Sequence, residues 1–205
     1  IDSALKESLV SIGRIDSALC IQLLQIAVEQ KSDSLLATSY NWMGNYYSVS
    51  KGDNSTALDY YFKALPLAEK TKDKRRISSV YFDIAELYSY LQNNEEQLKY
   101  TRKGGENLPD PSHPLYYFML VQYQSNLALY FIKTQNADSA IYYTHAFELT
   151  GRKKNNLLFE YSVMFLSGAA RALAGDKDLA DVYYKKAIAL APKLKGSIGK
   201  LRFGQ

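Results

Sequence analysis

The stretch from Ala37 to Ala68, ATSYNWMGNYYSVSKGDNSTALDYYFKALPLA, decides the fold. Its first half carries four residues at the i, i+3, i+4, i+7 spacing of one helical stripe, namely Tyr40, Met43, Gly44 and Tyr47. Gly52 suits the left-handed position after a helix, and the polar residues behind it can cap another helix. The second half also keeps small and aromatic residues on one stripe, namely Ala57, Tyr61 and Ala64. The stretch therefore predicts a helical hairpin in which small residues lie where the two helices cross.

Weaker copies of this hairpin recur before and after it. The small position of the second helix marks each copy at intervals of 39 to 43 residues, in the series Ala18, Ala57, Gln97, Ala140 and Ala180. A fixed period of this kind indicates a repeat array in which each hairpin is stabilised by its neighbours. We expect an all-α superhelix (solenoid) of about five hairpins, the first truncated, over residues 1–192, with units at about 1–31, 33–70, 74–107, 115–151 and 155–192. Residues 193–205 would form a basic tail or linker.

Individual helices can be predicted in more detail. A short helix is expected at residues 3–11, and the next one, from Asp16 to about Lys31, should bury one stripe made of Leu19, Leu23, Leu24 and Ile26. A later helix should fray at the pair Gly104-Gly105, and Pro192 should end the array. The segment 106–114 carries three prolines and should be a loop. It is either a flexible joint between two sub-arrays or a tolerated surface insertion.

The pattern resembles the tetratricopeptide repeat (TPR). That family has a large aromatic residue, Leu-Gly and Tyr in the first helix, and Ala, an aromatic residue and Ala in the second. The matching residues here are Tyr40, Met43-Gly44, Tyr47, Ala57, Tyr61 and Ala64. The stretch departs from the family in having one residue inserted between Tyr47 and Gly52, and Glu69 where the family often has Pro. The long period is similar to that of repeats in sensor and regulatory regions of bacterial signalling proteins.

The resemblance implies a concave groove, lined by the first helices, that binds a protein or peptide. Family groove positions lie three residues before, one after and four after the small residue of each first helix. In this sequence they are Asn41, Asn45, Ser48, Phe82, Glu86, Ser89, Ser125, Leu129, Ile132, Phe165, Ala169 and Ala172. The amides of Asn41 and Asn45 can both donate to and accept from a peptide backbone. The last three residues are apolar, so we expect them to be covered by a following helix or to form an interface.

One family binding mode is excluded by residue type. Relatives that bind chaperone C-termini hold a carboxylate with a Lys/Arg clamp on the groove face. The equivalent positions here carry no cation and are Thr38, Asn41, Ser79, Asp83, Gln122 and Asn126.

No constellation of residues indicates catalysis, a metal or a cofactor. His113 and His145 lie in unrelated contexts, so they do not indicate a shared metal site. Cys20 lies in an apolar helix, so we expect a core thiol. The sequence therefore predicts a protein that is not an enzyme.

Charge is distributed unevenly along the chain. Residues 1–150 hold 14 Lys+Arg against 17 Asp+Glu, whereas residues 151–205 hold 11 against 4. The basic end suits an anionic partner or a membrane, but the favoured interpretation is a solvated terminal face, and nucleic acid is not the expected partner. No run approaches the ~20 apolar residues of a membrane span. Because the chain begins at Ile1, we expect a fragment of a longer protein, periplasmic if it belongs to a membrane sensor kinase and otherwise cytoplasmic.

The functional expectation is a protein-binding module, the sensor or scaffold part of a larger bacterial signal-transduction protein such as a histidine kinase or transcriptional regulator. Two alternatives remain open. One is a structural interaction protein that forms homodimers through its C-terminal repeat. The other is a nucleic-acid-associated regulator that uses the basic C-terminal end.

Overall fold

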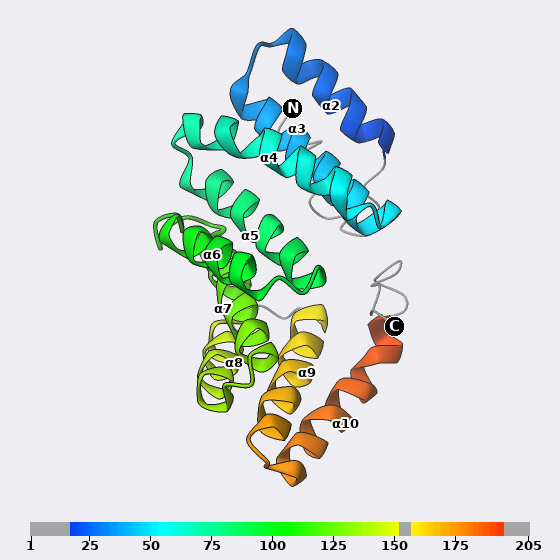
Figure 1. Cartoon of the computed structure of the whole chain (residues 1–205), viewed down its shortest axis with the longest axis vertical. Helices are drawn as coiled ribbons and strands as arrows, with labels where there is room; N and C mark the ends of the chain where they lie inside the picture. Colours follow the sequence, from blue (N-terminus) through cyan, green and yellow to red (C-terminus); the bar gives the residue numbers. More distant parts are fainter. Residues whose placement is uncertain (1–16, 152–156, 195–205) are drawn as a thin grey trace. The chain divides into compact units, whose positions relative to one another are not determined.

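The computed structural model describes residues 17–151 and 157–194, and these are helical without any strand (Figure 1). The helices are α2 (Ser17–Glu29), α3 (Asp33–Asn45), η1 (Tyr46–Lys51), α4 (Asn54–Thr71), α5 (Lys74–Tyr90), α6 (Asn94–Glu106), α7 (Tyr116–Lys133), α8 (Ala137–Gly151), α9 (Leu157–Leu173) and α10 (Lys177–Leu194). The predicted all-α class is therefore confirmed. The expected helix at 3–11 and most of the basic tail lie outside the described residues.

The described residues form two compact units, the first made of 17–71 with 193–194 and the second of 72–151 with 157–192. In the first unit α3 packs against both α2 and α4. In the second unit α6 packs against α5 and α7, and α8 packs against α7 and α9. The first helices of successive hairpins also contact one another, because α7 packs against both α5 and α9. Segment 106–114 connects α6 and α7 inside the second unit, so the division does not coincide with it.

The turns inside the hairpins share one backbone conformation. Each first helix is followed by a residue in the left-handed conformation, which is Gly52 and Gly175 in two hairpins but Gln92 and Gln135 in the other two. The next helix then begins with a side-chain cap: the carboxylate of Asp53, for example, accepts a hydrogen bond from the Thr56 amide at 3.0 Å. Such caps satisfy amides that the first turn of a helix leaves without partners. The turn chemistry seen in the sequence is thus borne out for Gly52 and Asp53.

Where the two helices of a hairpin cross, a small residue on the first helix faces a larger residue on the second. Two hairpins pair a glycine of the first helix with a tyrosine of the second, as Gly44 with Tyr61 and Gly168 with Tyr184. A Cβ added at Gly44 would lie 2.5 Å from Tyr61 Cδ1, so the ring occupies the space that the glycine leaves open. The equivalent positions of the other two hairpins hold a buried alanine and a buried threonine, as Ala85 with Thr101 and Ala128 with Thr144.

Aromatic stacking joins the same helices near the turns. The stacked pairs are Tyr47 with Tyr60, Tyr88 with Tyr100 and Phe131 with Tyr143, at centroid distances of 5.4, 5.6 and 5.4 Å. Each pair joins the first and second helices of one hairpin. Many of the tyrosines therefore serve packing, which accounts for part of their unusual number, 18.

The residue inserted after Tyr47 is accommodated by a change of helix type. The first helix of this hairpin continues as the π-helical segment η1, in which each turn holds about one more residue than an α-helix. The amide of Gly52 accordingly bonds to the carbonyl of Tyr47, five residues back. The insertion thus widens the last turn and leaves the Gly52 turn in place.

Three local expectations are wrong. Ile26 is exposed, whereas Cys20 and Ala27 supply the fully buried positions of α2. Gly104 and Gly105 remain helical inside α6, because each makes room for an aromatic ring of a neighbouring helix. Pro192 lies inside α10, which continues to Leu194. Tertiary packing outweighs intrinsic propensity at the glycine pair.

Candidate functional site

The face formed by α5, α7 and α9 in the second unit brings together the largest group of predicted groove positions. Two contacts fix the register of the first two helices. Lys133 Nζ, at the end of α7, donates to the Ser89 carbonyl at 2.6 Å and to its hydroxyl at 2.7 Å. Nearer the other end, the rings of Phe82 and Tyr123 lie 6.3 Å apart. Residues equally far from Ala85 and Ala128 therefore lie at about the same level on the two helices.

On α5, three predicted groove residues have different environments. Phe82 is only 1% exposed, and its ring lies against Gly104, so it supplies packing rather than surface. Ser89 is buried, and its carbonyl accepts a hydrogen bond from the Lys133 ammonium. Glu86 is exposed, and its Oε1 accepts a hydrogen bond from the Tyr90 hydroxyl at 2.7 Å. Tyr90 itself is 57% exposed.

On α7, the predicted residues lie on a continuous stripe of surface. Leu129 and Ile132 are half-buried, and Ser125 is half-buried with its hydroxyl donating to the Gln122 carbonyl at 3.0 Å. Phe118, three helical turns before Leu129, is 51% exposed on the same stripe. This face of α7 is therefore mainly apolar.

On α9, Phe165 is 44% exposed even though α10 follows it. Its ring stacks on Tyr161 at 6.3 Å and is tilted against Tyr184 at 6.1 Å. Ala169 is half-buried and Ala172 is exposed. In the described residues, these three positions are only partly covered.

The predicted residues of the first unit lie on α3 and η1. Asn41 is buried, at 7% exposure, so its amide lies mostly inside the packing. Asn45 is half-buried, and its Oδ1 accepts a hydrogen bond from the Tyr61 hydroxyl at 2.6 Å. Ser48 is half-buried within η1. The tyrosine that fills the space at Gly44 thus also fixes the orientation of the Asn45 amide.

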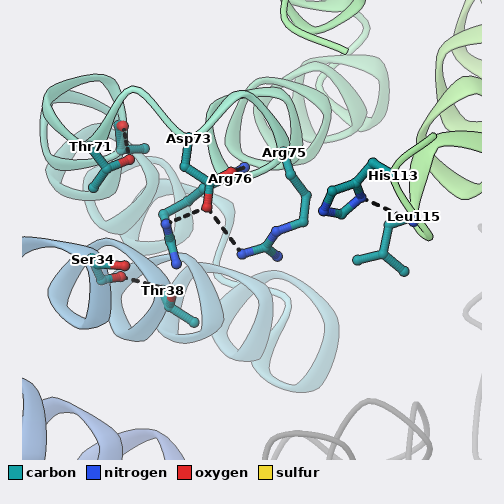
Figure 2. Close-up of polar contacts among 9 residues, drawn as sticks. Ser34, Thr38, Thr71, Asp73, Arg75, Arg76, His113 and Leu115 are labelled. Carbon is teal, nitrogen blue, oxygen red and sulfur yellow. Dashed lines mark hydrogen bonds and ion pairs between the residues drawn. The ribbon is translucent and has the colours of Figure 1, made fainter. Parts of the chain in front are cut away.

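The two histidines lie in different places, one in a loop and one on a helix. Figure 2 shows His113 in the loop before α7, where its Nδ1 accepts a hydrogen bond from the Leu115 amide at 3.1 Å. Nearby, the Asp73 carboxylate at the start of α5 pairs with Arg76 at 2.7 Å and with Arg75 at 3.6 Å. His145 is exposed on α8. The contacts of His113 and Asp73 stabilise a turn and a helix start.

Burial changes the electrostatics of one cation on this face. Desolvation lowers the pKa of Lys133, because water is partly excluded where its ammonium reaches Ser89. The last residue of α7 thereby satisfies a carbonyl at the C-terminal end of α5, an end that favours positive charge.

Within residues 17–151 and 157–194, no three or more His, Cys, Asp or Glu side chains are grouped as a metal ion would require. None of the helices described there combines the length and apolarity needed to cross a membrane. No protein-family model matches the chain, and no curated protein matches it either.

Sequence reasoning missed Tyr90 and Phe118 as members of the face. Both could have been found by extending the groove stripe along α5 and α7 beyond the three family positions. Conversely, the transfer of family positions included Phe82, because nothing in the spacing shows that Gly104 opens a space for its ring.

Proposed function

We propose that this chain is a non-catalytic module that binds a protein or peptide along the first helices of a TPR-like superhelix. The observation that carries the proposal is the layer of α5, α7 and α9, which pack one on the next. This layer leaves Glu86, Leu129 and Phe165 partly or fully at the surface while the opposite stripes are buried. Successive helices with aligned surface stripes form an extended binding surface in repeat proteins.

A site-specific photocross-linker tests this function. We would replace Leu129 by a benzophenone-bearing amino acid, with a matched variant carrying it at Tyr142, which is 68% exposed on α8. Cross-linking in a lysate of the source organism should yield one defined product from position 129 and none from position 142. Equal products from both positions, or a product from 142 alone, would place binding on another face.

The place of the module in a larger protein rests on the long repeat period. We propose that it is the sensor or scaffold part of a signal-transduction protein. The coding sequence that surrounds this chain tests the idea directly. A kinase or DNA-binding domain in the same reading frame is expected, and a reading frame that carries only a metabolic enzyme beside this chain would contradict it.

A second candidate, a homodimer through the last hairpin, is favoured by exposed apolar residues there. Phe165, Val182 and Ile188 are exposed on α9 and α10. Exposed apolar side chains of this kind can be covered by a second copy of the chain. Light scattering across a range of concentrations should show a dimer that Phe165→Ser and Ile188→Ser weaken. A monomer at all concentrations would exclude this candidate.

A further inference from the structure

We propose that the binding face selects protein segments that present a Lys or Arg side chain next to a large apolar side chain. The proposal rests on the proposed binding function and specifies its ligand. The surface concerned, here termed the acidic–apolar patch, consists of Glu86 and Tyr90 on α5 and Leu129 and Ile132 on α7.

The register places the four residues together. Glu86 follows the buried Ala85 directly, as Leu129 follows the buried Ala128. The hydrogen bonds from Lys133 to Ser89 join the two helices at the level just beyond these residues. Tyr90 and Ile132 accordingly lie at neighbouring levels on adjacent helices.

Glu86 and Tyr90 form a unit suited to a cation. The Tyr90 hydroxyl donates to Glu86 Oε1 at 2.7 Å, which holds the carboxylate beside a largely exposed ring. A carboxylate can accept several hydrogen bonds, so this contact leaves acceptor capacity for an ammonium or guanidinium group. An aromatic face adds an attraction for the same cation. An anionic ligand would be repelled, so the chemistry is opposite to that of a carboxylate clamp.

Lys133 lies at the same level of the two helices as the patch, but its ammonium already has hydrogen-bond partners. The ammonium of Lys133 is directed to the Ser89 carbonyl and hydroxyl. It therefore stabilises the packing of α7 on α5 and leaves the Glu86 carboxylate to an external cation.

The α7 half of the patch supplies apolar contact. Leu129 and Ile132 are half-buried, so each offers part of its surface to a ligand while its position is fixed by packing. Apolar area that is removed from water on binding contributes affinity without a charge requirement. Together the two halves require a segment with both kinds of side chain.

Three fluorescently labelled hexapeptides of one design test the proposal with the full chain. The first is acetyl-Ala-Lys-Leu-Lys-Phe-Ala-amide, and the other two carry Gln or Glu in place of both lysines. Anisotropy titrations, with amide chemical-shift mapping up to millimolar peptide, should show the Lys peptide binding about tenfold more tightly than the Gln peptide. The Glu peptide should not bind. Added salt should weaken the Lys peptide only.

Variants separate the two halves of the patch. Glu86→Gln should remove most of the preference for the Lys peptide, whereas Leu129→Ser should weaken the Lys and Gln peptides alike. Glu95→Gln, which changes an exposed carboxylate on α6, is the matched control and should leave both affinities unchanged.

Equal binding of the Lys and Gln peptides at Leu129 would overturn the cation preference and leave the binding function intact. No shift at Glu86 or Leu129 with any peptide, together with no cross-link from position 129, would overturn both. A dimer that Glu86→Gln dissociates would identify a second copy as the occupant and would also overturn the proposal.

Discussion

The replacement of Gly44 by alanine is a direct test of how the hairpins pack. The added Cβ would lie 2.5 Å from Tyr61 Cδ1, closer than real atoms approach. The ring cannot simply move away, because its hydroxyl is held by Asn45 at 2.6 Å. Overpacking of this kind costs about 1–3 kcal/mol, and the better helix propensity of alanine returns about 1 kcal/mol. We therefore expect Gly44→Ala to lower the free energy of unfolding by up to about 2 kcal/mol.

The natural hairpins supply the control. Tyr61→Thr should cost about 3 kcal/mol through lost packing, but it reproduces the residue found at Thr101, opposite Ala85. In the Tyr61→Thr background, Gly44→Ala should be neutral or stabilising. The space beside residue 44 is then open, and alanine still has the higher helix propensity. The interaction energy of the double-mutant cycle should be about 2 kcal/mol in favour of the double variant.

Trp42, the one tryptophan of the chain, lies in α3 two residues before Gly44. Its fluorescence in urea follows the first unit separately from the second, which matters because two units need not unfold together. If Gly44→Ala costs the same in both backgrounds, or nothing in either, the compensation between small and large residues is not what shapes the crossing.

The remaining predictions concern turns, a helix-to-helix bond and pH. Gln92→Gly or Gln135→Gly should stabilise the chain by about 0.5–1 kcal/mol in urea, because each position is left-handed. Lys133→Met should cost about 1–3 kcal/mol by removing the two hydrogen bonds that Lys133 donates to the buried Ser89, and hydrogen exchange of α5 should rise. Hydrogen bonds within the first turn of α4 lower the pKa of Asp53, so its contribution is present above pH ~4 and is lost as pH falls through the lowered value. The melting temperature of Asp53→Asn, followed by Trp42 fluorescence, should therefore fall less than that of the wild type on acidification.

Much of the hairpin architecture follows from local pattern. The stripe at Tyr40 and Gly44 reappears in the structure as α3, and the turn at Gly52 reappears as the left-handed residue that follows η1. These features depend on residues close in sequence, so spacing alone predicts them. The sequence also shows the extra residue after Tyr47. Spacing alone does not predict that it is accommodated as η1, because this depends on keeping the Gly52 turn in register with α4.

Features that depend on distant residues could not be predicted in this way. Gly104 and Gly105 weaken a helix by propensity, yet they lie inside α6 because Phe82 and Tyr123 pack directly on them. The contact between Phe82 and Gly104 also affects the candidate site. Because Phe82 is buried, Glu86 is the first surface residue of that stripe of α5. Family positions transferred by spacing identify a stripe of a helix, but the partner helix determines which members of that stripe reach the surface.

The first helix of a hairpin has some residues that pack against the second helix and others that face solvent. Residues of α5 that face α6 are fixed by small-to-large fitting, so their substitution changes stability. Glu86 and Tyr90 lie outside that fit and interact mainly with each other and with solvent, so their chemistry can vary at little cost to the fold. The position equivalent to Glu86 is the aliphatic Leu129 on α7 and the small Ala169 on α9. The same repeated hairpin can therefore present an acidic, an apolar or a small surface in turn, and the order of these surfaces along the layer is what would specify a ligand.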